Sequence, residues 1–400
     1  MMKIYIKRES YIKKIKPFID KGIVKVLIGQ RRVGKSFVLF QIIDEIKKIN
    51  KKANIIYINK ESNEFEFIND YKDLLEYIKE KQDKKNKNYL FIDEIQDINK
   101  FELAIRDLVL KDNFDIYITG SNSNIFSSEL ATFLSGRYIE IEIKSLSFNE
   151  FLKFHNLKKN KESLFKYMKF GGMPYLVNLE LTEDIVYEYL KNIYNTIILK
   201  DVVFRNDIRN AEFLNRLIEF LSDNIGNLIS ANKINDFLKS QKVEISINTI
   251  LNYINFLNQT FFIQKVKRQN IIGKKIFEIN EKYYFEDLGI KNSIFGYKES
   301  DINKILENLV YSHLKNLGYN VFVGVIENKE IDFVAFKNDK KIYVQVCYLL
   351  FNKETKDREF GNLLSIKDNY EKIVVSMDQI SNNYMGIKNI NILDFLTDWE

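Results

Sequence analysis

The sequence predicts an α/β protein that begins with a parallel sheet covered by helices on both faces. Over residues 1–150, short apolar runs alternate with segments whose apolar residues recur at helical spacing. The apolar runs contain few polar residues, which is typical of parallel strands buried on both sides. The chain has 400 residues, which is enough for two to four domains at roughly 150 residues each.

The elements of this first segment can be placed in order. A strand at 24–28 ends at Gly29, and a helix over 35–49 follows, with Val38, Leu39, Ile42 and Ile46 on one face. Further strands are predicted at 54–58, 89–92, 115–119 and 138–143, and further helices at about 67–81 and 99–110.

The remaining chain changes character three times. Residues 148–225 have a helical pattern that is interrupted by GGMP (171–174). Two short helices, at 232–239 and 247–257, precede a β-rich stretch over 261–279. A helix at 302–317 is followed by strands near 321–325, 331–336, 341–350 and 372–377. We therefore predict four segments, at 1–150, 151–225, 226–300 and 301–400. The first is an α/β segment with a parallel sheet, the second is a helical connector, the third combines two short helices with a β-rich stretch, and the fourth is a small α/β tail.

Composition excludes several classes of protein. Hydrophobic residues make up 46% of the chain, so it can fold without help. The single cysteine, Cys347, excludes a disulfide framework or a cysteine-built zinc site, and two histidines argue against a histidine metal centre. No signal-peptide core and no run of 18 apolar residues is present. We expect a soluble cytoplasmic protein without a membrane partner, and its net charge of +6 is compatible with a nucleic-acid partner.

A phosphate-binding loop follows the first strand. Residues 29–36 read GQRRVGKS and match G-x-x-x-x-G-K-[ST] in full. The glycines let successive backbone N–H groups converge on phosphate oxygens, and the following helix adds its N-terminal positive charge. A lysine here reaches the β- and γ-phosphates, and the hydroxyl after it ligates Mg²⁺. We predict that ATP is bound by Gly29, Gln30, Arg31, Arg32, Val33, Gly34, Lys35 and Ser36, with Ser36 also a metal ligand.

An acidic pair supports this site. The apolar strand at 89–92 runs into Asp93 and Glu94. A buried strand that delivers a carboxylate to the phosphate site is what Mg²⁺ binding requires, so Asp93 is the second predicted metal residue. Glu94 is placed to orient or deprotonate an attacking water. Because the strand at 54–58 intervenes in the sequence, the order favours loop ATPases that carry an added catalytic glutamate.

Three further residues are candidates for roles at this site. Ser121 and Asn122 follow the strand at 115–119 and would sense the γ-phosphate or position the water, although an ordinary Ser/Asn turn reads the same way. Arg137, in LSGRY, is a candidate arginine finger, although a lone arginine beside a turn is more commonly a surface residue.

Taken together, these motifs resemble a group of uncharacterised bacterial and archaeal ATPases, AAA-type proteins with a C-terminal domain of unknown function. The resemblance covers nearly the whole chain and is carried by motifs at 29–36, 89–96, 117–123, 134–138, 147–151, 171–176 and 199–206. It implies an ATPase module, a helical connector, a winged-helix-like segment and a tail similar to restriction-type endonucleases. The group's site residues carry over to Lys35, Asp93, Glu94, Ser121, Asn122 and Arg137.

The third segment is similar to a helix-turn-helix with a basic hairpin. Asn248, Asn252 and Asn255 would be polar positions on or near the second helix, and amides can read adenine edges. The stretch after it carries five cations and no acid, at Lys265, Lys267, Arg268, Lys274 and Lys275. We predict a contact with double-stranded DNA through 246–275; a packing module with a solvated basic turn is the alternative.

The tail keeps part of a nuclease pattern. The restriction-type pattern uses an acid on a helix, an aspartate, and then Asp/Glu-x-Lys one strand later, because carboxylates hold Mg²⁺ while lysine activates water. Glu307 and Asp332 fit, but Gln345 and Cys347 stand where the second acid and the lysine belong. We predict a nuclease-like fold that has lost its chemistry.

The sequence as a whole therefore predicts a Mg²⁺-dependent ATPase that acts on or near DNA and can form a homo-oligomer. A nucleotide-dependent regulatory switch with a protein partner and no steady turnover is the first alternative. An ATP-regulated nuclease is the second.

Overall fold

The chain folds into two compact units in a computed structural model, the first comprising Met1–Lys144 with Gln259–Phe261 and the second Ser145–Asn258 with Phe262–Glu400. The structure describes residues 5–123, 134, 136–206, 208, 210–243, 245–273, 276–327, 329–350, 353–379 and 383–399. Each unit is built on one sheet and is described by itself.

The first unit follows the predicted alternation of strands and helices. Its strands are β1 (Val24–Ile28), β2 (Asn54–Asn59), β3 (Asn88–Asp93), β4 (Phe114–Gly120) and β5 (Tyr138–Glu142). Its α-helices are α1 (Glu9–Ile15), α2 (Lys35–Ile49), α3 (Tyr71–Lys81) and α4 (Phe101–Val109), with short 3₁₀ turns η1 (Lys16–Phe18), η2 (Asn63–Phe65) and η3 (Ile95–Asp97). Helix α3 starts later than predicted because Asp70 caps it and forms a capping box with Asp73.

The five strands form one parallel sheet in the order β2-β3-β4-β1-β5. This confirms the predicted fold class. Strand β4 lies between the strand that leads into the loop and the strand that carries Asp93. Because all strands are parallel, their carboxyl ends meet at one edge, and the polar residues that follow β1, β3 and β4 converge there.

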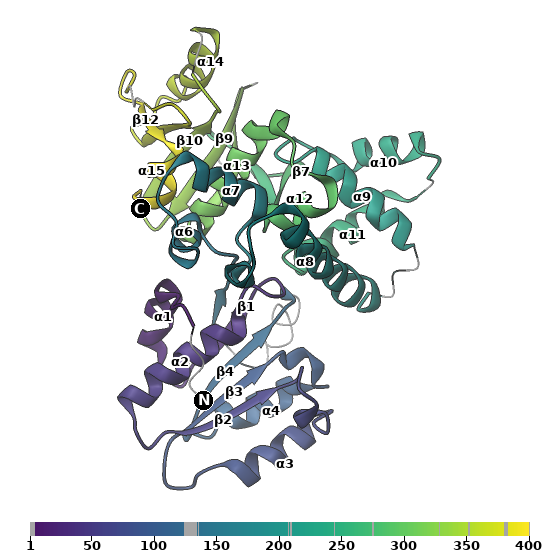
Figure 1. Ribbon diagram of the computed structural model, residues 1–400, viewed down its shortest axis with the longest axis vertical. Coiled ribbons are helices and arrows are strands. Elements are labelled where there is room, and N and C mark those ends of the chain that lie inside the picture. The colour runs from purple at the N-terminus through teal and green to yellow at the C-terminus, as the bar shows by residue number, and fades with distance from the viewer. Residues whose placement is uncertain are drawn as a thin grey trace. The chain divides into compact units, whose positions relative to one another are not determined.

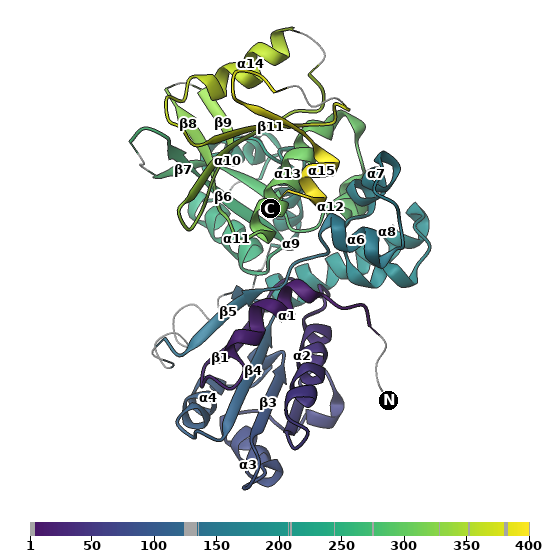
Figure 2. The same cartoon turned by 90° about the vertical axis from the view of Figure 1, so that its left-hand side faces the viewer.

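Helices cover both faces of this sheet. In Figure 2, α2 and α4 lie on opposite sides of the strands, and α3 packs against α4. The core beneath includes Val26, Ile58, Leu90, Ile92 and Ile118, each fully or almost fully buried. The residues between them on the strands, such as Leu27 and Phe91, are also fully buried. Burial on both faces explains the uninterrupted apolar runs in the sequence.

The second unit begins with helices and ends in an α/β arrangement. Its first part contains α6 (Phe148–Phe154), α7 (Lys161–Phe170), η5 (Pro174–Asn178), α8 (Glu183–Thr196), the π-helix η6 (Ile197–Phe204), α9 (Ala211–Asp223), α10 (Ala231–Ser240) and α11 (Ile247–Gln259). Its later helices are α12 (Leu288–Phe295), η7 (Glu299–Asp301), α13 (Ile302–Asn316), α14 (Lys353–Leu364) and α15 (Ile392–Thr397).

Seven strands form the sheet of this unit, in the order β12-β11-β10-β9-β8-β6-β7 (Figure 1). They are β6 (Ile263–Asn270), β7 (Ile276–Phe285), β8 (Asn320–Ile326), β9 (Lys329–Lys337), β10 (Lys340–Val346), β11 (Glu371–Ser376) and β12 (Lys388–Asn391). Strands β10, β11 and β12 are mutually parallel, whereas β9 is antiparallel to both of its neighbours.

The boundary predicted at residue 300 falls inside this sheet. Strand β6 pairs with β7 on one side and with β8 on the other, so the predicted basic hairpin and the predicted tail share backbone hydrogen bonds. Helices α9, α10 and α11 followed by the β6–β7 hairpin keep the element order of a winged helix. The hairpin, however, is a continuous part of a larger sheet.

The GGMP motif has a packing role. The backbone N–H of Gly172 donates to the carboxylate of Asp287 at 2.8 Å, and Asp287 also caps α12 by accepting from Ile290 N–H. A Cβ at Gly171, whose φ is +74°, would lie 2.3 Å from an Asp287 oxygen. Only glycine allows this approach. Burial raises the pKa of Asp287 to about 6, although its hydrogen bonds from backbone N–H groups oppose the shift.

This carboxylate makes the second unit less stable as the pH rises. The native state holds the Asp287 proton up to pH about 6, whereas the unfolded chain releases it near 3.8, so stability is highest below 3.8 and is lost through about 6. Between pH 5 and pH 7 we expect a loss on the order of 1 kcal/mol from this group. Urea unfolding followed by fluorescence of Trp399, the single tryptophan, measures it.

Asp287→Asn is the matched variant for this experiment. It keeps the side-chain shape and removes the titration, so the difference in unfolding free energy between parent and variant should change over this pH range. Equal pH slopes for the two proteins would contradict the assignment.

Candidate nucleotide-binding site

The predicted phosphate loop lies between β1 and α2. Gly29 has φ of +146°, and a Cβ there would lie 2.1 Å from the carbonyl oxygen of Ile143, so only glycine fits. Gly34 has φ of +96° and is the N-cap residue of α2. The buried guanidinium of Arg8 donates to the backbone carbonyl of Val33, in the loop, at 3.1 Å. It also donates to the backbone carbonyl of Lys144, which follows β5, at 2.8 Å. The loop is therefore held from outside as well as by its own glycines.

Lys35 turns back over the loop. Its ammonium donates to the carbonyls of Gly29 and Gln30 at 3.1 and 3.2 Å and lies 3.4 Å from a Glu94 carboxylate oxygen. Arg31 is buried and forms an ion pair with Glu61 at 2.7 Å, whereas Arg32 is exposed. The two basic residues of the loop therefore differ: one is held beside the site and the other faces solvent.

The structure brings together Ser36 and Asp93, the two residues predicted to hold a metal ion. The Asp93 side chain is 2% exposed and accepts hydrogen bonds from the hydroxyls of Ser36 and Thr119, the latter at 2.5 Å. Burial raises the pKa of Asp93, while these two hydrogen bonds oppose the shift. Tyr57 on β2 donates to the second carboxylate oxygen at 3.2 Å.

Glu94 has a strained backbone and a well-held side chain. Its φ of +56° is unusual for a residue with a Cβ, and its N–H donates to the Thr119 hydroxyl at 3.0 Å. Burial favours a raised pKa, but the ammonium of Lys35 and a hydrogen bond from Gln96 lower the pKa of Glu94 to about 2.

The other two candidates at this edge behave differently from Arg137. Ser121 and Asn122 are 1% and 3% exposed and directly follow β4, so the structure brings them to the carboxyl edge beside Glu94. Arg137 is exposed at the amino end of β5, next to Val24 at the start of β1. The five residues of β1 separate it from the loop by about 16 Å. Within one chain, Arg137 does not reach the phosphate site.

Sequence reasoning missed Thr119, Gln96 and Arg8. Thr119 links Asp93 to the backbone of Glu94, and its place at the end of an apolar strand was the available signal. Arg8 lies well before the loop and carries no motif, so nothing in the sequence could place it there.

The residues present fit a nucleotide with Mg²⁺. Both polar atoms of the Gln30 amide are buried without a hydrogen-bond partner, at the point where loop N–H groups would meet phosphate oxygens. Among the described residues, no three His, Cys, Asp or Glu side chains are arranged to hold a metal ion. A hydroxyl with one carboxylate, as in Ser36 and Asp93, instead suits Mg²⁺ that keeps several waters.

The predicted DNA-contact segment is only partly basic in the structure. Asn248, Asn252 and Asn255 all lie on the exposed face of α11. Lys267 is exposed, but the ammonium of Lys265 forms an ion pair with Glu281 at 3.0 Å. Lys274 and Lys275 lie outside the described residues. One of the predicted cations is thus neutralised inside the protein.

The predicted tail residues lie together around an unexpected lysine. Lys282 on β7 is 3% exposed, and its ammonium lies 2.6 Å from Glu307, 2.7 Å from Glu330 and 3.7 Å from Asp332. Burial lowers the pKa of Lys282, but these carboxylates outweigh it and raise the pKa overall. Gln345 accepts from the Asp332 N–H at 3.2 Å, and Cys347 is buried. A lysine therefore lies among these acids, supplied by a different strand from the one that the pattern names.

The parallel sheet, the loop and the Asp-Glu pair define a P-loop ATPase fold of the AAA type. Residues 21–152 match a family described as an AAA domain, and residues 161–301 match a domain of unknown function (DUF8612). The domain of unknown function thus covers the middle of the chain. None of the described helices combines the length and apolar character that a membrane span requires.

Two relatives extend along nearly the whole chain. An uncharacterized protein of Haemophilus influenzae is 38% identical over 403 residues, which cover 99% of this chain and 100% of that protein. An uncharacterized protein of Methanocaldococcus jannaschii is 35% identical over 399 residues, covering 93% of this chain and 85% of that protein. The chain belongs to the family of these uncharacterized bacterial and archaeal proteins.

Two solved structures are also similar. A Walker-type ATPase of Pyrococcus abyssi aligns with 73% of this chain and 96% of its own, at 14% identity and a TM-score of 0.48. The ORC1 protein of Aeropyrum pernix, solved in complex with DNA, aligns with 73% of this chain and 92% of its own, at 10% identity and a TM-score of 0.35. Both scores are below 0.5, so the fold assignment rests on the sheet and the family match.

Proposed function

We propose that the protein is a Mg²⁺-dependent ATPase that acts on or near DNA. The observation that carries the proposal is the convergence of Lys35, Ser36, Asp93 and Glu94 at the carboxyl edge of one parallel sheet. These residue types are those that bind phosphates, hold Mg²⁺ and orient water in P-loop enzymes. Steady-state hydrolysis of ATP, measured with and without Mg²⁺, tests the proposal directly.

Each residue has a separate role. The loop N–H groups and Lys35 bind the phosphates, and Ser36 and Asp93 hold Mg²⁺, which supplies charge neutralisation on the phosphates. Glu94 orients the water that attacks. The Lys35–Glu94 ion pair links phosphate binding to the orientation of water by Glu94. A bound phosphate draws the Lys35 ammonium toward itself, and this removes the positive charge that lowers the pKa of Glu94. Ser121 and Asn122 are placed to report on the same anion.

Arg137 completes the site only from a second copy of the chain. Its position at the amino edge keeps it from the loop of its own chain, so a finger role requires a homo-oligomer. Hydrolysis per subunit should then rise with protein concentration as oligomers form.

For DNA, we expect a weak contact in which Lys267 neutralises one phosphate. Lys267→Ala should reduce the slope of log affinity against log salt for a double-stranded fragment by about 0.9. Fluorescence anisotropy across a salt series measures it, and Lys340→Ala, which removes an exposed lysine from another strand, is the matched control. A salt slope near zero in the parent would exclude DNA and favour a protein-contact module.

We further propose that the tail has a nuclease-like fold and does not cut. Lys282 satisfies the carboxylates of Glu307 and Glu330 at hydrogen-bond distance, and Asp332 accepts a bond from Val346 N–H at 2.8 Å. These groups therefore already have partners. Metal-dependent nicking of plasmid DNA that disappears in Asp332→Ala would overturn this part and favour an ATP-regulated nuclease.

A nucleotide-dependent switch is the second candidate, and the Lys35–Glu94 ion pair favours it. With Glu94 held by both Lys35 and Gln96, basal turnover is expected to be slow until a partner changes the site. Purification with bound ADP, together with turnover below about one per minute, would favour the switch, since enzymes typically reach 1–10³ per second.

A further inference from the structure

Two cavities lie at opposite edges of the parallel strands β10, β11 and β12. The smaller, of about 310 Å³, is at their amino ends, and the larger, of about 830 Å³, follows the carboxyl ends of β10 and β11. Ligands in open parallel sheets bind outside the carboxyl ends of strands, and typical ligand pockets measure 300–1,000 Å³. The two cavities can therefore be compared by their charges.

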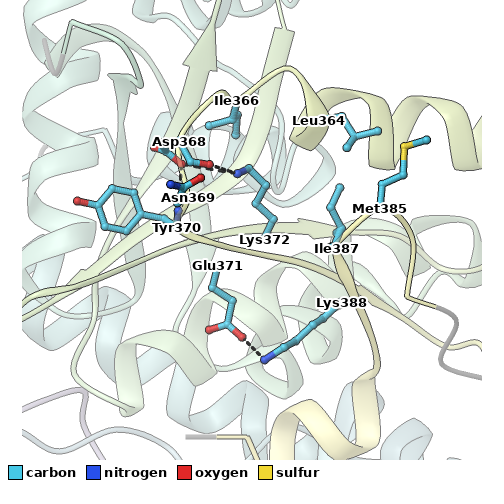
Figure 3. A pocket seen from close by; sticks show the side chains of 11 residues that line it. Leu364, Ile366, Asp368, Asn369, Tyr370, Glu371, Lys372, Met385, Ile387 and Lys388 are labelled. Atoms are coloured by element: carbon cyan, nitrogen blue, oxygen red, sulfur yellow. Dashed lines mark hydrogen bonds and ion pairs between the residues drawn. The ribbon is translucent and has the colours of Figure 1, made fainter.

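The charged groups of the smaller cavity are paired with one another. Figure 3 shows the carboxylate of Glu371 facing the ammonium of Lys388, which lies 2.6 Å away. The ammonium of Lys372 donates to the backbone carbonyl of Asp368 at 2.5 Å and lies 3.7 Å from its carboxylate. The ammonium of Lys341 lies 3.3 Å from the other carboxylate oxygen of Asp368. Charges that satisfy each other leave nothing to recognise a ligand.

The larger cavity differs in this respect. Three lysines line it, Lys161 at the start of α7 and Lys353 and Lys356 in the first turns of α14, and none forms an ion pair among the described residues. Two acids also line it, of which Asp378 already accepts the Leu350 N–H at 2.9 Å. Asp357 is the other. Like charges gathered around one cavity repel one another and favour an anion between them.

The rest of the lining is apolar and aromatic. Leu350, Phe360 and Met377, which are 6%, 4% and 3% exposed, line this cavity, and Phe360 belongs to α14. The ring of Tyr384 lies against that of Phe360, with centroids 5.3 Å apart, and remains 46% exposed. A half-exposed ring beside a buried one offers a surface on which a planar group can stack.

Amide groups add hydrogen-bonding capacity beside the rings. Gln379, Asn383 and Asn389 line the cavity, and Asn389 is 5% exposed and fixed by Ser376, whose hydroxyl donates to it at 3.2 Å. Amides pair with the edges of nucleobases, and lysines bind phosphate. The three kinds of side chain together match one class of ligand.

We propose that this cavity binds a nucleotide, separately from the phosphate loop of the first unit. The base stacks on Tyr384, whose ring Phe360 supports from behind, the amides meet the edge of the base, and Lys161, Lys353 and Lys356 bind the phosphate. A free nucleotide and the terminal nucleotide of a single strand share this chemistry.

The test uses the full chain carrying Lys35→Ala, so that the phosphate loop is removed from the measurement. Calorimetry with ADP, inorganic pyrophosphate and a 5′-phosphorylated oligothymidylate gives the affinities. In this Lys35→Ala background, the double substitution Lys353→Ala and Lys356→Ala should weaken ADP binding at least about tenfold, since two charge-assisted hydrogen bonds are lost. The matched control is Lys340→Ala with Lys367→Ala, two exposed lysines that form no ion pair with any residue that the structure describes. ADP binding by this control should stay within about twofold of the parent.

Tyr384→Ala tests the aromatic half of the site. It should weaken ADP at least about fivefold and leave pyrophosphate unchanged, because only the base stacks. If ADP binds more tightly than the oligonucleotide, the occupant is a free nucleotide. If the oligonucleotide binds more tightly than ADP, the occupant is a strand end. Absence of ADP and oligonucleotide binding, equal effects of the two lysine pairs, or pyrophosphate binding as tightly as ADP would overturn the proposal. ATP hydrolysis is measured on the chain with intact Lys35, so failure of the proposed ATPase function can be distinguished from failure of the cavity proposal.

Discussion

Glu94→Gln is expected to bind ATP and to hydrolyse it about 100 to 10,000 times more slowly than the parent chain. An amide cannot accept a proton from water or attract it as a carboxylate does, and positioned acid–base groups contribute factors of this size. Binding should persist because the exchange frees Lys35 from its ion pair at 3.4 Å. Calorimetry for binding and phosphate release for turnover separate the two effects.

The control for this variant is Glu66→Gln, which neutralises an exposed glutamate of the same unit. It should hydrolyse ATP at the parental rate. Turnover by Glu94→Gln within about threefold of the parent would mean that another group orients the water.

Lys35→Ala is expected to weaken ATP by at least about 100-fold. The phosphates lose their main cation in a buried site, where a charge-assisted hydrogen bond is worth more than in water. A second effect acts in the same direction. Without Lys35, the buried carboxylate of Glu94, which is 7% exposed, no longer has the positive charge that lowers its pKa. When this carboxylate is ionised, it repels the incoming phosphate anion.

Lys47→Ala is the matched control, because Lys47 is an exposed lysine in the last turn of the same helix. Thermal unfolding checks that both variants fold. If Lys35→Ala bound ATP within a few-fold of the parent, the phosphate site would lie elsewhere.

The first unit was largely predictable because its signals are local. A glycine-rich turn after a buried strand predicts phosphate binding, since the backbone conformation and the helix start are fixed within eight residues. The polar residues that follow different strands could be assigned to one site, because parallel strands bring their carboxyl ends to one edge of the sheet. The prediction of an α/β parallel sheet is confirmed. Roles for Arg137 and the DNA segment stay predictions.

The second unit was less predictable because its contacts join distant segments. The predicted boundary at 300 separates β7 from β8, yet β6 pairs with both. Lys282 was therefore overlooked beside Glu307 and Asp332, since a pattern read along one strand does not include a lysine from another. Asp287, which holds Gly172 from 115 residues away, is a second case.

By itself, the sequence determined the order in which strands and helices alternate in the first unit, and it predicted which residues gather at the candidate phosphate site. Local backbone conformation and the period of the apolar residues are encoded in short stretches of chain, so both can be read without a fold. Only the tertiary structure decided that Arg137 lies at the edge away from the loop, that Glu281 neutralises Lys265, and that Lys282 lies among the acids of the tail. Those facts depend on strand pairing between distant segments, and the energy of a charge is set by the groups that burial places around it.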